Sequence, residues 1–355
     1  MRNMGILDWW RSRDHSADDP QDKELIARAV EHVVQTTNPR LRFVPRYDER
    51  LSPAVASSLK YARSVIAMMP TPHEASRAGW NSDPCMRAFF ATSDDVIRSI
   101  GRAPNLHTFF DQNPAAREAY AVLNMKMIER KTLGTALEGD VIHRDVAQTT
   151  VSFEDHRIGV CGPSEPDLKQ AIGRRIMEQL SLEGLARVAD DRESREQLEE
   201  ERALLKVRLQ LQQREGMGMG SALGDTDATE QTEISRLEAE LADNAKKLDK
   251  AGVGTEILDH ELERVCEVLA EPTQYFFISK KRLRLDRMNV VQQENSPQAG
   301  EEIEFFIGQF TAGRLISEIT TVGKPRTRAF ALVRFSRTDL QTGGLRFDEA
   351  ASMLI

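Results

Sequence analysis

The sequence predicts an α+β fold with an N-terminal helical domain, a small antiparallel β-domain and a long antiparallel coiled-coil hairpin inserted between the β segments. Residues 165–270 show helical apolar spacing on both sides of a glycine-rich stretch at 216–224, which predicts a helical hairpin. After residue 140, and again after residue 272, the apolar period shortens to two, which predicts strands before and after the hairpin.

These changes of pattern divide the chain into five predicted segments. The boundaries are 1–18 for an amphipathic N-terminal arm, 19–140 for a helical domain, 141–163 for a β-hairpin that joins the C-terminal sheet, 164–271 for the coiled-coil hairpin with its tip at 215–229, and 272–355 for a C-terminal β-domain.

The charge of the chain is concentrated on the predicted hairpin. Of a net charge of −8, residues 182–271 hold 23 acidic and 12 basic side chains, whereas residues 272–355 hold 9 acidic and 12 basic. An acidic arm repels phosphates, so we do not expect nucleic acid as its partner. The chain has no run of 18 apolar residues, and its three cysteines are too scattered for a disulfide framework or a zinc site. Its first residues lack the pattern of a secretory leader, so we do not expect secretion. We therefore expect a cytoplasmic protein without cofactor or metal.

The N-terminal segment, residues 1–18, places Trp9 and Trp10 side by side among basic residues. Adjacent tryptophans of this kind fill a groove on their own protein or make a peripheral membrane contact. We favour the groove, because the segment is short for stable membrane binding.

The predicted helical domain, residues 19–140, has four places where a capping residue precedes proline. Proline is well tolerated at the first position of a helix, where its missing N–H would have no partner. Four helices are therefore expected to begin at Pro20, Pro53, Pro84 and Pro114.

The predicted β-hairpin pairs Val141–Phe153 with Arg157–Cys161 through a turn at 154–156. Because such a hairpin is marginal alone, we expect it to join the C-terminal sheet. Ser164, followed by Asp167 three residues later, predicts a capped helix start for the first arm.

The two arms of the predicted coiled coil have matching apolar positions. In an antiparallel hairpin the numbers of facing residues add to a near-constant, and Leu204–Leu241 and Val207–Leu237 add to 445 and 444. The same sum is expected down to the base of the arm. A break at Gly252–Gly254, opposite the acidic residues 190–191, predicts a hinge.

The C-terminal β-domain begins with an alternating basic segment. Arg282 and Arg284 are predicted on one face of a strand, with Leu283 and Leu285 on the other. Such a face either lies in solvent, docks an acidic partner or binds anions such as nucleic acid or lipid phosphates.

Cys161 is the one candidate for catalysis. It precedes a predicted helix start, where the helix dipole lowers a thiol pKa, and His143, Asp145 and His156 are near in sequence. The alternative is a buried apolar cysteine at the end of a strand. We favour the buried cysteine.

The function predicted from these features is a non-enzymatic interaction or assembly protein whose arm binds a protein partner or itself. The alternatives are a cysteine-dependent enzyme centred on Cys161 and anion binding by the C-terminal β-domain. The candidate interaction residues are Trp9, Trp10, Met217, Met219, Leu223, Arg282 and Arg284.

Overall fold

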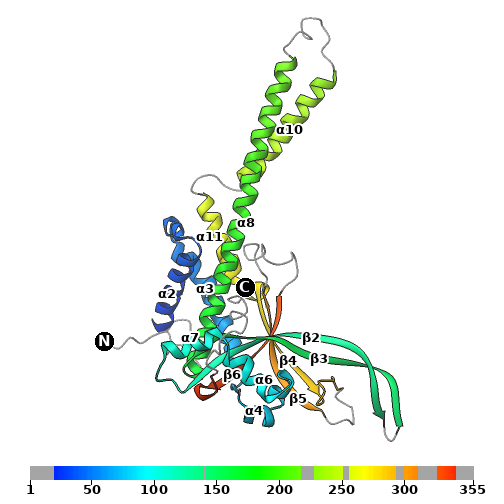
Figure 1. The fold of residues 1–355 in the computed structure, drawn as a ribbon. Helices are drawn as coiled ribbons and strands as arrows, with labels where there is room; N and C mark the ends of the chain where they lie inside the picture. The colour runs from blue at the N-terminus through cyan, green and yellow to red at the C-terminus, as the bar shows by residue number, and fades with distance from the viewer. Residues whose placement is uncertain are drawn as a thin grey trace, which may run out of the picture.

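A computed structural model describes residues 20–138, 141–216, 228–250, 256–292, 300–310 and 326–340. It combines helices with an antiparallel sheet, and a long helix leaves the sheet between its third strand and its later strands, as the sequence predicts (Figure 1). Within the described ranges, no helix is both long and apolar enough to cross a membrane.

The N-terminal part of the chain is built from short and medium helices. They are α2 (Pro20–Thr36), η1 (Pro39–Phe43), α3 (Tyr47–Ala67), α4 (Arg77–Ser82), α5 (Pro84–Phe89), α6 (Ser93–Gly101) and α7 (Pro104–Gln112), with the short strand β1 (His73–Glu74) after α3.

Two of the four predicted helix starts are correct. Pro20 begins α2, and Pro84 begins α5, whose N-cap Asp83 accepts a hydrogen bond from the backbone N–H of Cys85. Pro53 instead lies inside α3, because the left-handed backbone of Arg46 (φ 56°) already starts that helix. The prediction at Pro114 is wrong, since no helix begins there and the chain passes into a strand.

In the described part of the chain, five strands form the main sheet. They are β2 (Glu118–Glu138), β3 (Val141–Gly162), β4 (Phe276–Leu285), β5 (Glu301–Phe310) and β6 (Arg326–Ser336), in the order β3-β2-β6-β5-β4 with antiparallel neighbours. β1 adds a short parallel pairing to β6. The expected β-hairpin thus joins the C-terminal strands, and the helical arm is inserted between strands of one sheet.

The extent of the hairpin differs from the prediction. Residues 118–138, expected to be helical, form β2, and residues 154–156, expected to be a turn, lie within β3. The reason is an alternation in β2 that buries Ala119, Ala121 and Leu123 on one face of the sheet. Its many helix-forming residues hide this period of two.

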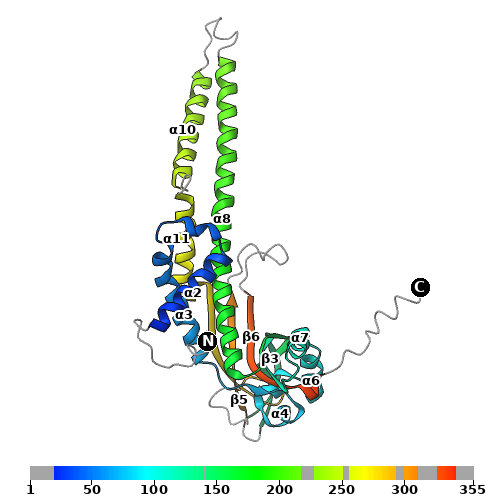
Figure 2. The same ribbon diagram turned by 90° about the vertical axis from the view of Figure 1, so that its left-hand side faces the viewer.

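Helices cover both faces of the sheet. On one face, α2, α3 and the bases of the arm helices pack on a layer formed by Phe276, Ile278, Phe306, Phe330 and Leu332. On the other face, α4 to α7 pack on Ala121, Leu123, Met125, Phe305, Val333 and Phe335. Figure 2 shows these helices on opposite sides of the strands. The helices of the expected N-terminal domain are therefore divided between two cores that share the sheet.

The outer halves of β2 and β3 run past the sheet as a two-stranded ribbon (Figure 1). Pairing of β2 with β6 ends at Met125, whereas its pairing with β3 continues to Glu138. The segment after β4 supports the start of this ribbon, since the N–H of Val151 donates to the carbonyl of Asn289 at 2.9 Å.

The arm is formed by α8 (Glu165–Gly216) on its outward path and by α10 (Ala228–Lys250) and α11 (Glu256–Ala270) on its return; α12 (Pro272–Tyr275) follows α11. Its capped start is confirmed, because the hydroxyl of Ser164 accepts from the N–H of Asp167 and donates to its carboxylate. At 52 residues and about 1.5 Å per residue, α8 is about 78 Å long.

The predicted sum of about 445 holds in the outer arm, where Asn244 contacts Glu201, but the residues of α8 predicted to form the seam are wrong. Leu205 is buried towards α10, whereas Leu204 is 53 % exposed and does not face Leu241. Asn244 of α10 instead donates to the carbonyl of Leu198 (3.1 Å) and to the carboxylate of Glu201 (2.9 Å). Because Leu204 and Leu205 are adjacent, α8 has apolar residues on two faces. The spacing alone did not show which of these faces packs against α10.

The constant sum fails in the basal part of the arm, where α11 is the return helix. Arg264 contacts Asp191 at 2.7 Å, and those numbers add to 455 rather than 445. The basal return helix α11 therefore meets α8 in a register of its own.

The observed register gives a testable expectation for crosslinking. In a variant whose native cysteines are replaced by alanine, Glu201→Cys with Asn244→Cys should react with a short thiol crosslinker within one chain, because these side chains touch. The matched pair Leu204→Cys with Leu241→Cys should not, because Leu204 points away. Mass spectrometry of the products decides; a preference for the second pair, or crosslinks only between chains, would contradict this register.

Candidate functional site

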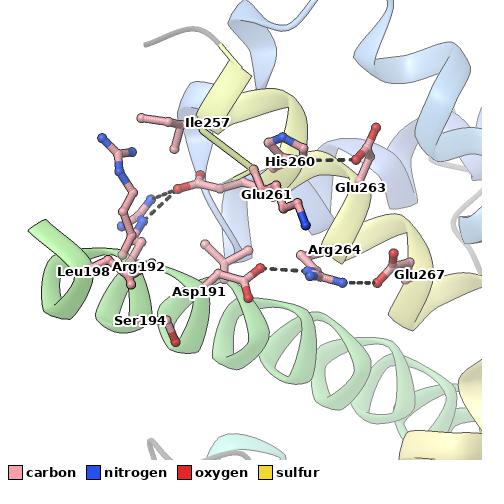
Figure 3. A pocket seen from close by; sticks show the side chains of 13 residues that line it. Asp191, Arg192, Ser194, Leu198, Ile257, His260, Glu261, Glu263, Arg264 and Glu267 are labelled. Atoms are coloured by element: carbon pink, nitrogen blue, oxygen red, sulfur yellow. Dashed lines mark hydrogen bonds and ion pairs between the residues drawn. The ribbon is translucent and has the colours of Figure 1, made fainter. Parts of the chain in front are cut away.

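The root of the arm is held by ion pairs between α8 and α11 (Figure 3). The guanidinium of Arg264 on α11 contacts the carboxylate of Asp191 on α8 at 2.7 Å and that of Glu267 at 2.9 Å. Arg192 on α8 contacts Glu261 on α11 at 2.6 Å. The pairs of Asp191 with Arg264 and of Arg192 with Glu261 join the two helices.

Glu261 is the buried centre of this network. Its side chain is only 6 % exposed, and its carboxylate accepts hydrogen bonds from Arg192 at 2.7 Å and from the amide of Asn38 at 2.5 Å. A buried carboxylate costs several kcal/mol unless it is paired in this way. Arg50 of α3 adds a contact to Asp259 of α11 at 2.6 Å. The arm is therefore braced by the N-terminal helices.

A cleft of about 410 Å³ lies at this root, between α8 and α11 (Figure 3). Four basic and four acidic side chains line it, and most of them pair with each other. Because these charged side chains already pair with each other, few of their charges are available to bind a charged ligand. We therefore interpret the root as a mechanical joint rather than as a binding site.

The outer part of α8 carries an apolar stripe, which we define as Leu204, Val207 and Leu211. Each is 53 % exposed. Their spacing of three and four residues puts them in one row along the helix, on a different face from Leu205. Three large apolar side chains in a row on a projecting helix are typical of a surface that contacts another helix.

Basic residues surround this stripe. The preceding part of α8, residues 190–201, holds seven acidic and two basic residues, whereas residues 202–214 hold four basic residues and no acid. The four cations are Arg202, Lys206, Arg208 and Arg214, and none of them forms an ion pair with an acid in the described parts of the chain. The apolar stripe is thus flanked by four basic side chains, although the arm as a whole is acidic.

Most of the interaction residues predicted from the sequence are not placed by the structure. Trp9, Trp10, Met217, Met219 and Leu223 lie outside the described residues. Their roles stay predictions. The sequence analysis placed residues of the apolar stripe in the inner seam of the coiled coil, whereas the structure exposes them. Their helical spacing fits a row on either face of α8, so the spacing did not distinguish the two.

Arg282 and Arg284 lie on β4, and the predicted alternation is present in part: Leu285 is buried and Arg282 is exposed, whereas Leu283 and Arg284 are both half-buried. Arg282 contacts the carboxylate of Glu304 on β5 at 2.9 Å, and Arg284 donates to the carbonyl of Gly300 at 3.3 Å. Both cations are therefore paired, Arg282 with an acid of β5 and Arg284 with the carbonyl that directly precedes β5.

Cys161 lies at the end of β3, and its Sγ is 3.8 Å from the carbonyl oxygen of Gly159. Burial raises the pKa of this thiol to about 12, which is opposite to the shift that a nucleophile needs. His156 is held elsewhere, because its Nε2 donates to the carbonyl of Phe89 at 2.8 Å. His143 pairs with Ala136 in the ribbon, whereas Cys161 pairs with Ala121 inside the sheet. The structure does not bring the expected catalytic residues together.

Comparisons of the chain with models of protein families, with curated proteins and with solved structures find no match. The surface of the arm and the side-chain clusters of the fold are therefore the basis for assigning a function.

The buried pair at the arm root predicts a large effect of a surface mutation. Arg192→Met should lower the free energy of unfolding by about 2–3 kcal/mol, because Glu261 loses its charged partner. The control Arg195→Met removes a pair with the exposed Glu199, which should cost about 0.5 kcal/mol or less. Urea unfolding measures both. Equal effects, or no recovery when Glu261→Gln is added to Arg192→Met, would contradict the role of this pair.

The raised pKa of Cys161 predicts slow alkylation. A raised pKa keeps the thiol protonated to higher pH, so at pH 8 its thiolate fraction is about 10⁻⁴, against about 0.2 for an unperturbed thiol. Iodoacetamide should therefore modify Cys161 about 10³-fold more slowly in the folded protein than in urea, with a rate that still rises at pH 10. Mass spectrometry across pH gives the rate; a plateau below pH 9 would indicate an activated thiol instead.

Proposed function

We propose that the chain is a non-enzymatic interaction protein whose arm binds an acidic amphipathic helix of another protein. The observation that carries the proposal is the apolar stripe, Leu204, Val207 and Leu211, exposed on α8 among cations without ion-pair partners. Apolar side chains at helical spacing supply the contact area of helix-to-helix recognition, and flanking charges select the partner.

The charge of the stripe supports a different protein rather than a second copy of this chain. If two stripes faced each other, residues 202–214 of both copies would lie side by side in a parallel or an antiparallel pair. These segments hold four basic residues each and no acid. Like charges across such an interface oppose association. A partner helix with apolar residues at the same spacing and acidic flanks would remove this repulsion.

The construction of the arm supports the same proposal. The stripe lies 39 to 46 residues from the start of α8, which corresponds to about 60–70 Å along the helix. Because α8 is anchored in the core and braced at its root by α11 and α3, the stripe is presented without a flexible linker. A binding surface that is already ordered loses little conformational entropy when it binds.

The two alternative functions have less support. Cys161 has a protonated thiol without a base beside it, and Arg282 is paired within its own sheet. The proposed location is the cytoplasm, which the free thiols of the three cysteines support.

Site-specific photo-crosslinking in the native cells tests the proposal. A benzoylphenylalanine at Val207 should crosslink to one segment of another protein, and mass spectrometry should identify that segment as an amphipathic helix with acidic flanks. The same probe at Gln213, which is exposed but outside the stripe, should not. Adding Leu204→Gln and Leu211→Gln should reduce the crosslink at least tenfold, since burying each leucine contributes about 2 kcal/mol.

Leu182→Gln is the matched control, because Leu182 is a partly exposed leucine of α8 outside the stripe. It should leave the crosslink intact. Sedimentation velocity of the purified chain should show a monomer. Crosslinks to a second copy of the chain, or to a basic or non-helical segment, would contradict the proposal.

A further inference from the structure

Three potential metal ligands meet on the side of the molecule away from the arm. His73 is on β1, Asp83 is the N-cap of α5, and Cys85 is the second residue of α5. Their ligand atoms all lie within 4.8 Å of one another. Within the described ranges, this is the group of histidine, cysteine and acidic side chains whose geometry matches a metal site.

The fold brings these side chains together in a fixed arrangement. Nδ1 of His73 lies 2.6 Å from Oδ2 of Asp83, and the other carboxylate oxygen of Asp83 accepts from the N–H of Cys85 at 2.8 Å. Pro84 sets the backbone between the two α5 ligands. The Sγ of Cys85 rests 3.7 Å from the carbonyl oxygen of Glu304 on β5. The cluster therefore links β1 and α5 to an inner strand pair of the sheet.

The imidazole of His73 provides a second, independent observation. Its Nε2 is buried and has no hydrogen-bond partner among the described residues. Leaving a buried polar nitrogen unpaired costs about 1–3 kcal/mol. Because Nδ1 faces Asp83, Nε2 is the nitrogen of this ring that is open to a water or an ion. His73 and Asp83 are 17 % and 25 % exposed, which leaves a path for an ion from solvent.

We propose that His73, Asp83 and Cys85 bind a divalent first-row transition metal ion of the Zn²⁺ type. Nitrogen, oxygen and sulfur together are the donor set that Zn²⁺ accepts, and hard ions such as Mg²⁺ and Ca²⁺ avoid the thiolate. Ligand atoms around a tetrahedral zinc ion are about 3.3–3.7 Å apart, which lies within the 4.8 Å that bounds the separations of this cluster. Side-chain movements of about 1 Å therefore complete the site.

The three ligands also match the charge and the coordination number of a bound divalent ion. A carboxylate and a thiolate neutralise a divalent ion, and the neutral imidazole adds a third bond, so the half-buried cluster carries no net charge. Three protein ligands leave the fourth tetrahedral position for water. The ion would tie β1 and α5 to each other and so stabilise the helical layer formed by α4 and α5.

Cobalt binding to the purified full-length chain tests the site. Co²⁺ should bind with a stoichiometry of one per chain, give a thiolate-to-cobalt absorption in the near ultraviolet, and be displaced by Zn²⁺. Cys85→Ser should abolish the thiolate band. Cys161→Ser and Cys266→Ser are matched controls, since both remove a partly buried thiol elsewhere, and both should keep the band.

Asp83→Asn separates ligation from folding. Asparagine caps a helix as well as aspartate does, so α5 should stay intact while the anionic ligand is lost. We expect at least tenfold weaker Co²⁺ binding with an unchanged melting temperature of the metal-free protein. If Cys85→Ser does not fold, His73→Gln carries the same test. Absence of stoichiometric binding, or a thiolate band that persists in Cys85→Ser, would overturn the proposal.

Discussion

The continuity of α8 is the constraint on which the rest of the structure depends. Its first turns are part of the core, where Leu168, Ile172 and Leu180 are buried beside the sheet, and its last turns lie far beyond that core. Gly162 makes the transition possible, because a Cβ at this position would come within 2.7 Å of the backbone N of Leu168. Strand β3 therefore continues into the arm with almost no intervening loop.

A helix of this length cannot depend on its own backbone hydrogen bonds, since most helical stability in proteins comes from packing. The chain supplies that packing in two forms. Near the core, α11 contributes apolar residues and ion pairs, with Glu261 held between Arg192 and Asn38. Farther out, α10 contributes a narrow seam that includes Leu237 and a buried Asn244. A polar residue in such a seam favours one register over others at some cost in stability.

Local signals in the sequence were reliable where one interaction decides the structure. The capped start at Ser164 needs only its own neighbours, and it is present as predicted. The strand β2 was missed because its alanine, leucine and methionine residues favour a helix locally, and only pairing with β6 and β3 makes them a strand. The two faces of α8 were confused because Leu204 and Leu205 are adjacent and equally apolar. Choosing between them requires the position of α10.

The cluster of His73, Asp83 and Cys85 could not be predicted from the sequence for a related reason. Zinc motifs are recognised by repeated cysteine or histidine spacings, and this chain has none. The three side chains meet because β1 pairs with β6 while α5 packs across β5, and both are tertiary contacts.

The joint at residues 191 and 264 gives the arm a mechanical property. The part of α8 beyond Asp191 has 25 residues, so it extends about 38 Å from that joint. Rotating this segment by about 10° would move its far end by about 7 Å, roughly the diameter of a side chain. The root is held both by these ion pairs and by buried apolar residues of α8 and α11, among them Val188, Leu262 and Val265. Because α8 is continuous through this point, a small tilt of the helix at its root is magnified into a larger displacement of its outer turns.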